Sequence, residues 1–206
     1  MFALVESGSI TKFFSGNRGI TIGDNQYPKA IFTLWTKSER EAIGIYEVEM
    51  DTSKRKDEQW YINTNITYAF GSGKVTGSYE DAAAKNHEDT KYTSQDKTDG
   101  KIPAGKDVGD VKVEGLKTVL IRTVKKQAAA NLSETDWYIV RKADSGTAVP
   151  SAITTHRAAV RTKAASMEKE ILDASNTAAL ETLYTYTEQE DGSVTRPLGE
   201  LPRLES

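Results

Sequence analysis

Apolar and polar residues alternate in short runs near the start of the chain, and turn-forming residues separate the runs. Residues 2–5 and 10–14 flank the cluster Glu6-Ser7-Gly8-Ser9, which has the length and composition of a hairpin turn. Residues 45–50 alternate cleanly, as in a strand with one buried face. Periodicity does not decide whether residues 31–35 form a short strand or lead into a helix. The chain is therefore predicted to open with a hairpin and to continue as a sheet.

A second hairpin and one short helix complete the predicted N-terminal domain, residues 1–80. Residues 60–70 are rich in aromatic and β-branched side chains, and a Gly-Ser-Gly turn separates them from a further strand at 74–79. Thr36-Lys37-Ser38-Glu39 has the form of a capping box, which predicts a helix that ends just before Gly44. Together these patterns predict a small antiparallel sheet with one short helix.

Residues 81–112 differ in composition from the sequence on either side. They contain 6 lysines and 7 acidic residues. Their larger apolar residues are few, namely Tyr92, Ile102, Val108 and Val111. Because such a segment cannot offset its ordering entropy by burial, it is predicted to be an extended polar linker.

From residue 113 the spacing of apolar residues becomes helical. Residues 116–130 fit an amphipathic helix of about 15 residues, whose predicted stripe is Leu116, Leu120, Thr123, Gln127 and Ala130. A longer helix is predicted after Pro150. Its apolar stripe follows heptad spacing and is interrupted by one arginine: Ile153, Arg157, Val160, Ala164, Met167, Ile171 and Ala174.

This stripe has two interpretations, a coiled-coil seam within an oligomer or the inner face of an intrachain hairpin with residues 116–130. Three heptads are short for a free-standing coiled coil, which favours the hairpin. A last helix over 178–184 completes the predicted helical module, residues 113–186, and residues 187–206 are predicted to be a polar tail. The predicted fold class is α+β, with a small antiparallel β-rich N-terminal domain, an extended polar linker and a helical C-terminal module.

Charge and composition exclude several kinds of partner. The 206 residues carry 27 basic and 30 acidic side chains, a net charge of −3, whereas duplex binding needs a basic face that neutralises several phosphates. The lack of cysteine excludes disulfides, zinc-thiolate sites and thiol catalysis, and it fits a protein made in a reducing cytoplasm. The apolar runs are far shorter than the roughly 20 residues that span a bilayer. Neither nucleic acid nor a membrane is therefore expected as a partner.

No catalytic constellation stands out in the sequence. His87 and His156 are the only imidazoles, and neither has a second histidine or a nucleophile motif at a useful spacing. Gly71-Ser72-Gly73-Lys74 fails as a phosphate-binding loop, because the next residue is Val75 instead of Ser or Thr. Acidic residues are plentiful, but no carboxylate pair is singled out. The sequence therefore predicts no catalytic residue, no cofactor and no metal site.

One segment resembles a known family. It consists of Thr135-Asp136-Trp137-Tyr138-Ile139-Val140-Arg141-Lys142, then Gly146-Thr147-Ala148-Val149-Pro150, then His156-Arg157-Ala158-Ala159-Val160-Arg161. This order of a TDW turn, a proline and an arginine-bearing helix resembles the C-terminal module of tailed-bacteriophage tail-fibre proteins and tail-fibre assembly chaperones. The resemblance covers roughly residues 115–175. His156 departs from the family pattern, which often has tyrosine at that position.

The residues of this motif also have a physical interpretation. Thr135 and Asp136 can cap or tighten the turn between helices, and Trp137 offers a large apolar area to hold that turn against the helix pair. Arg157 and Arg161 lie one turn apart and can meet carboxylates or carbonyls of the turn. A structural role for these side chains is favoured over a direct partner contact. The candidate structural or interaction residues are Thr135, Asp136, Trp137, Tyr138, Arg141, Pro150, Arg157, Val160 and Arg161, with Trp35 and Trp60 as core or core-edge residues.

The resemblance implies a non-enzymatic structural protein of a tailed-phage virion, placed at the tail, the baseplate or the fibre attachment. Its partners would be other tail or fibre proteins, and it would form a trimer, a ring or another homo-oligomer within the assembly. It would be made in the cytoplasm of the host bacterium. Two other functions are considered: a tail-fibre assembly chaperone, and an enzyme that acts on host-surface polysaccharide.

Overall fold

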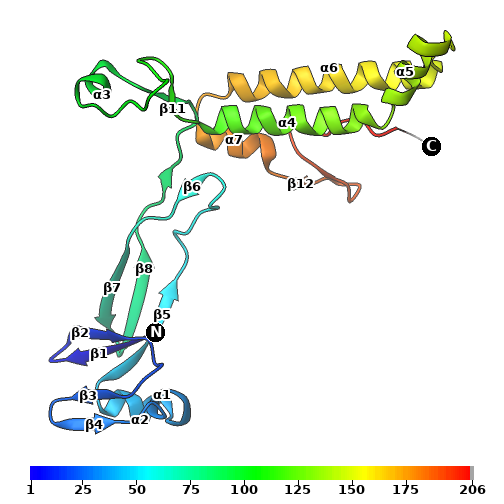
Figure 1. The fold of residues 1–206 in the computed structure, drawn as a ribbon. Helices are drawn as coiled ribbons and strands as arrows, with labels where there is room; N and C mark the ends of the chain where they lie inside the picture. Colours follow the sequence, from blue (N-terminus) through cyan, green and yellow to red (C-terminus); the bar gives the residue numbers. More distant parts are fainter. Residues whose placement is uncertain (205–206) are drawn as a thin grey trace. The chain divides into compact units, whose positions relative to one another are not determined.

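The computed structural model describes residues 1–204 and shows a mixed α+β chain (Figure 1). It divides into two compact units, Met1–Ala83 and a second unit that begins at Ala84. The first unit is rich in strands and the second is largely helical. The predicted fold class is therefore confirmed.

The first unit contains a five-stranded sheet in the order β2-β1-β5-β8-β7. Its strands are β1 (Phe2–Glu6), β2 (Ser9–Phe14), β5 (Ile45–Asp51), β7 (Ile66–Gly71) and β8 (Lys74–Tyr79). Both predicted hairpins are present, and each turns through a Ser-Gly pair with positive φ angles. The pairing of β5 with β8 is parallel, so the sheet is mixed and not wholly antiparallel as predicted. The long segment between these strands, which includes β7, makes that parallel pairing possible.

A separate two-stranded ribbon and two short helices accompany this sheet. The ribbon pairs β3 (Ile20–Ile22) with β4 (Asn25–Tyr27), and α1 (Ile31–Leu34) follows, so the segment left open in the sequence is helical. Helix α2 (Lys37–Ala42) begins with the predicted capping box, in which the side chains of Thr36 and Glu39 bond each other's backbone N–H groups. Helix α2 therefore forms where the local sequence predicts it.

The core of the first unit lies between the sheet, the ribbon and α1. Its buried cluster consists of Leu4, Ile20, Ile31, Phe32 and Ile45. Trp35 is partly buried against this cluster, and Trp60, which precedes β6 (Tyr61–Ile62), is 4% exposed. Both tryptophans are therefore core or core-edge residues, as predicted.

The prediction of an extended linker over residues 81–112 is wrong, because most of this segment belongs to a small folded lobe, residues 84–113. After β9 (Ala83–Ala84), the chain forms β10 (Thr90–Lys91), α3 (Ser94–Thr98) and β11 (Val111–Val113), and β10 pairs with β11. Polar contacts order this lobe in place of a large apolar core. The Lys117 ammonium, for example, binds both the Glu88 carboxylate (2.5 Å) and the Leu172 carbonyl (2.8 Å), which ties the lobe to the helices.

Asp96 is the main polar centre of this lobe. Its carboxylate accepts hydrogen bonds from the Lys112 ammonium (2.6 Å) and from the Thr93 N–H (2.9 Å) and hydroxyl (3.0 Å). The bond from Lys112, followed by those from Thr93, lowers the pKa of Asp96 from 3.8 to about 2. The charged form of Asp96 therefore stabilises the folded lobe.

We expect acid to loosen this lobe through Asp96. Because the folded-state pKa is depressed, the stabilisation is complete above the unfolded pKa of about 3.9 and is lost as the pH falls toward about 2. The protection factor of the Tyr92 amide, which donates to the Asp110 carbonyl, should therefore fall over that range in the native chain, when exchange is compared with the intrinsic rate at each pH. In Asp96→Asn, this protection factor should already be lower at pH 6 and should change less on acidification. Equal pH profiles for the two chains would contradict this role.

The helical part of the second unit is built on two long antiparallel helices. Helices α4 (Leu116–Ser133) and α6 (Ser151–Asp173) lie side by side, with α5 (Asp136–Ser145) between them in sequence and α7 (Thr177–Tyr184) after them (Figure 1). This arrangement confirms the intrachain hairpin that was favoured over a coiled-coil seam. No helix within residues 1–204 combines the length and apolar character needed to cross a membrane.

The whole predicted stripe of α6 is buried, and His156 of α6 is buried as well. All seven residues of the stripe are at most 8% exposed, and they are Ile153, Arg157, Val160, Ala164, Met167, Ile171 and Ala174. The facing side of α4 differs slightly from prediction. It buries Leu120, Val124 and Ala128 at steps of four, whereas Thr123 and Gln127 are exposed. Residues four apart on a helix form a ridge, and such a ridge on α4 can pack into a groove between side chains of α6.

The C-terminal segment also departs from its prediction as a polar tail. It contains the short hairpin of β12 (Thr187–Glu188) and β13 (Val194–Thr195). Leu198 is then completely buried, and its N–H donates to the Leu183 carbonyl (3.0 Å). The Arg196 guanidinium lies 5.1 Å from the ring centres of both Tyr184 and Tyr186. The segment is therefore folded onto the helices up to Pro202, whose carbonyl accepts from Asn131, while residues 205–206 of the predicted tail lie outside the described residues.

Candidate functional site

Arg157 joins the N-terminal part of α6 to the turn that precedes α5. Its Nη1 donates to the Leu132 carbonyl and to the Thr135 hydroxyl, each at 2.7 Å, and its Nη2 contacts the Asp136 carboxylate at 2.9 Å. Arg157 and Thr135 are 8% and 1% exposed. The arginine in the apolar stripe is therefore a buried anchor for the turn, and the predicted contact of Arg157 with a carboxylate and a carbonyl is confirmed.

Local sequence explains why the chain turns at this point. Helix α4 ends at Ser133, and both the N–H (3.1 Å) and the hydroxyl (3.0 Å) of Thr135 donate to the Leu132 carbonyl. Thr135 thus tightens the turn, but its hydroxyl does not cap α5. Asp136 occupies the first turn of α5, where the helix dipole favours a negative charge. At the other end, Gly146 stops the helix in the left-handed conformation (φ 71°).

Helix α5 carries an exposed surface that we call the α5 platform, formed by Trp137, Tyr138, Val140 and Arg141. The rings of Trp137 and Tyr138 lie 3.8 Å apart, and the Arg141 guanidinium lies 4.6 Å and 5.2 Å from their centres. Trp137 is 51% exposed and Val140 is 66% exposed. No residue of α5 is buried. The platform is a preformed cation–π stack on the surface of the second unit.

The exposure of Trp137 corrects its predicted role. Trp137 was expected to hold the turn against the helix pair, but its ring stacks on side chains of its own helix instead. The buried contacts of Arg157 with Thr135 and with the Leu132 carbonyl already fix the turn. The turn therefore does not need the apolar area of the tryptophan, which is left available on the surface.

The platform contains one basic side chain, Arg141, and two further basic residues of the second unit are Lys142 on α5 and Arg161 on α6. Among residues 1–204, none of them forms an ion pair with a carboxylate. Arg161 makes one long hydrogen bond, from Nη1 to the Arg157 carbonyl (3.5 Å). The expected contact of Arg161 with the turn itself is not present. The platform therefore combines aromatic and aliphatic area with uncompensated positive charge.

A hydrogen-bonded link near the site was not predicted from the sequence. His156 is 8% exposed, and its Nε2 lies 2.8 Å from Oδ1 of Asn131, whose Nδ2 donates to the Pro202 carbonyl (2.8 Å). The sequence offered one signal for it, because His156 immediately precedes the buried Arg157 on α6. This link connects α4, α6 and the C-terminal segment.

The remaining candidate residues lie outside the α5 platform, in the helical hairpin or in the first unit. Val160 is fully buried in the hairpin, and Pro150 lies at the N-terminal end of α6. Trp35 and Trp60 belong to the first unit and take no part in the α5 platform. The structure thus brings together two sets of predicted residues, the anchor of Arg157 with Thr135 and Asp136, and the aromatic stack of Trp137 and Tyr138 with Arg141.

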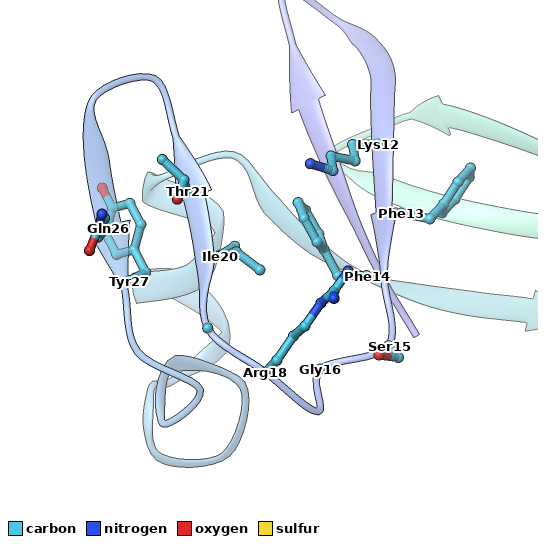
Figure 2. A pocket seen from close by; sticks show the side chains of 11 residues that line it. Lys12, Phe13, Phe14, Ser15, Gly16, Arg18, Ile20, Thr21, Gln26 and Tyr27 are labelled. Carbon is cyan, nitrogen blue, oxygen red and sulfur yellow. The ribbon is translucent and has the colours of Figure 1, made fainter.

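The first unit contains a second feature, an open cleft of about 660 Å³ (Figure 2). It lies between β2 and the β3–β4 ribbon. Its side chains are mixed in character: Lys12, Phe13, Phe14, Ser15, Arg18, Ile20, Thr21, Gln26 and Tyr27. No motif in the sequence marked these residues, because they come from three short strands and a loop.

Within the part of the chain that the structure describes, no group of three or more His, Asp or Glu side chains is placed to hold a metal ion. Comparisons with protein-family models, curated proteins and solved structures find no match to this chain. Its function is therefore inferred from the residues and contacts of the two units.

Proposed function

We propose that this protein is a non-enzymatic structural component of a tailed-phage virion that acts through protein–protein contacts at the tail, the baseplate or the fibre attachment. The observation that carries this proposal is the α5 platform, a rigid and exposed aromatic surface within the segment that resembles phage tail-fibre proteins. The partner is another tail or fibre protein. The chain is made in the host cytoplasm and joins an assembly in several copies.

The composition of the platform is that of a binding surface. Trp, Tyr and Arg are the residues most enriched among those that dominate binding energy at interfaces. Arg157 fixes the turn in advance, so the platform loses little conformational freedom on binding. A partner would therefore meet an ordered surface.

The spacing and charge of the platform indicate the kind of partner surface that fits it. Trp137, Val140 and Arg141 stand at positions i, i+3 and i+4, the spacing by which a helix anchors itself in an apolar groove. The positive charge of Arg141 favours acidic residues around that groove. The α5 platform therefore docks into an apolar groove with an acidic rim on a tail or fibre protein.

Truncation of Trp137 tests this function in the assembled particle. We expect the native chain in purified particles at a fixed ratio to the other tail proteins, as measured by mass spectrometry. In particles from phage that encode Trp137→Ala, its amount should fall by about tenfold or more, because a central interface aromatic contributes about 2 kcal/mol or more. Circular dichroism should show an unchanged fold, since Trp137 is half exposed.

Leu172→Ala is the matched control, because Leu172 is an apolar residue of similar exposure (57%) on α6, outside the platform. Its incorporation should equal that of the native chain. Equal loss in both variants, or no loss in Trp137→Ala, would contradict the role of the platform. Absence of the native chain from mature particles would overturn the proposal itself.

The second candidate is a tail-fibre assembly chaperone. The observation that favours it is that Trp137 and Val140 are exposed in the chain alone, as a surface that shields a fibre subunit before assembly would be. A chaperone would co-purify with a fibre protein from infected cells and be absent from finished particles. The particle analysis therefore separates the two functions.

A further inference from the structure

The cleft of the first unit is a preformed feature with an apolar floor. Ile20 is 8% exposed and belongs to the main core cluster, and Phe14 packs against that cluster from β2. Lys12 and Phe14 lie on the same face of β2, as residues two apart in a strand do. In Figure 2 the Lys12 and Arg18 side chains extend beside the Phe14 ring into the space between β2 and β3. The cleft therefore joins an apolar floor to a basic entrance.

The charge of this cleft is not balanced within the unit. No Asp or Glu lines it. Among residues 1–204, neither Lys12 nor Arg18 forms an ion pair, and the Lys12 ammonium lies 5.5 Å from the centre of the Phe14 ring. Five other basic residues of this unit do have carboxylate partners: Lys37, Arg40, Lys54, Arg55 and Lys74. The two cations of the cleft are therefore available for an anionic ligand.

Strand β3 forms one wall of the cleft, and the edge of β3 that faces away from β4 has no partner strand among the described residues. Among the described residues, β3 pairs only with β4, in a two-residue hairpin whose closing pair is Ile22 with Asn25. In such a hairpin the closing pair is hydrogen-bonded and the next pair is not. Thr21, which pairs with Gln26, therefore directs its N–H and C=O away from β4. Thr21 is also a cleft residue, so this edge can accept another strand.

We propose that the cleft binds an extended acidic segment of another protein, which adds as a strand to β3 and places carboxylates against Lys12 and Arg18. The strand edge explains the extended conformation, and the two cations explain the acidity. This contact lies in the first unit and is independent of the α5 platform.

A synthetic peptide tests the proposal on the full-length chain. The probe is an eight-residue peptide of alternating Glu and Thr with blocked ends, and the matched control peptide alternates Lys and Thr. Titration followed by NMR should show binding of the acidic peptide alone. The Thr21 amide should exchange with solvent about tenfold more slowly when the peptide is bound, because it gains a hydrogen-bond partner.

Two charge variants complete the test. Lys12→Gln combined with Arg18→Gln should weaken peptide binding by about tenfold, since each exposed ion pair contributes up to about 1 kcal/mol. Both side chains are exposed, so the fold should persist. Lys91→Gln combined with Lys126→Gln removes the same charge from exposed sites of the second unit and should leave binding unchanged. Trp137→Ala should also leave it unchanged, which separates this site from the α5 platform.

Three results would overturn the proposal. The first is no binding of the acidic peptide, and the second is equal weakening in both double variants, which would reveal general charge attraction. The third is binding without slower exchange at Thr21, particularly if inorganic phosphate competes fully with the peptide. That result would assign the two cations to a small anion and exclude strand addition.

Discussion

Replacement of Arg157 by alanine is expected to lower the free energy of unfolding of the helical unit by about 3 kcal/mol. The variant loses a buried side chain and its charged hydrogen bonds to the Leu132 carbonyl and the Thr135 hydroxyl. The ion pair with Asp136 contributes less, because Asp136 is more than half exposed. Urea unfolding followed by hydrogen exchange at amides of α4 and α6 measures the change in that unit.

Two further variants show which part of Arg157 matters. Arg157→Met keeps most of the buried chain and loses only the donors, so its destabilisation should be about half as large. Arg161→Ala is the matched control, because this exposed arginine lies one turn away and makes a single long hydrogen bond. Its effect should stay within about 0.5 kcal/mol. Full stability of Arg157→Ala would contradict the anchoring role.

Replacement of Leu198 by alanine is expected to cost about 3 kcal/mol and to release the C-terminal segment from the helices. Leu198 is fully buried, and truncation of a buried leucine leaves a cavity in addition to the lost transfer energy. Faster hydrogen exchange at the Leu198 amide, which bonds the Leu183 carbonyl, would report the release directly.

Leu204→Ala provides the control for this segment, because Leu204 is 40% exposed. Its stability should match that of the native chain within about 0.5 kcal/mol. If Leu198→Ala were equally neutral, the C-terminal segment would contribute nothing to the stability of the helical unit. The burial of Leu198 would then have to be an incidental contact.

The parts of the fold that the sequence predicted are those with local signals. The capping box of Thr36 and Glu39 and the Ser7-Gly8 turn each depend on residues close in sequence. The stripe from Ile153 to Ala174 could be predicted because a helix places those residues on one side regardless of the rest of the fold.

The parts that were missed depend on contacts between residues far apart in sequence. The parallel pairing of β5 with β8 is one example. The lobe over 84–113 is another example. Lys112 binds Asp96 and Lys117 binds the Leu172 carbonyl, and the pattern of apolar residues does not predict such polar contacts. A low apolar content predicts disorder only where polar groups do not find partners of this kind.

The candidate site was predicted in part. An arginine within an apolar stripe requires acceptors, and the TDW turn offered a carboxylate and carbonyls, so the contact of Arg157 with the turn could be foreseen. The position of Trp137 could not, because apolar area alone does not say whether a side chain faces its own unit or a partner. The cleft could not be predicted from the sequence, because Lys12, Arg18 and Thr21 come together only in the folded chain.

The bridging role of Asn131 determines the proton arrangement on a neighbouring ring. Its Nδ2 donates to the Pro202 carbonyl, so its Oδ1 is an acceptor, and the His156 nitrogen that faces it must carry hydrogen. The Nε2–H group of His156 is thereby held toward Asn131, and one amide side chain fixes the orientation of the imidazole where α4, α6 and the C-terminal segment meet.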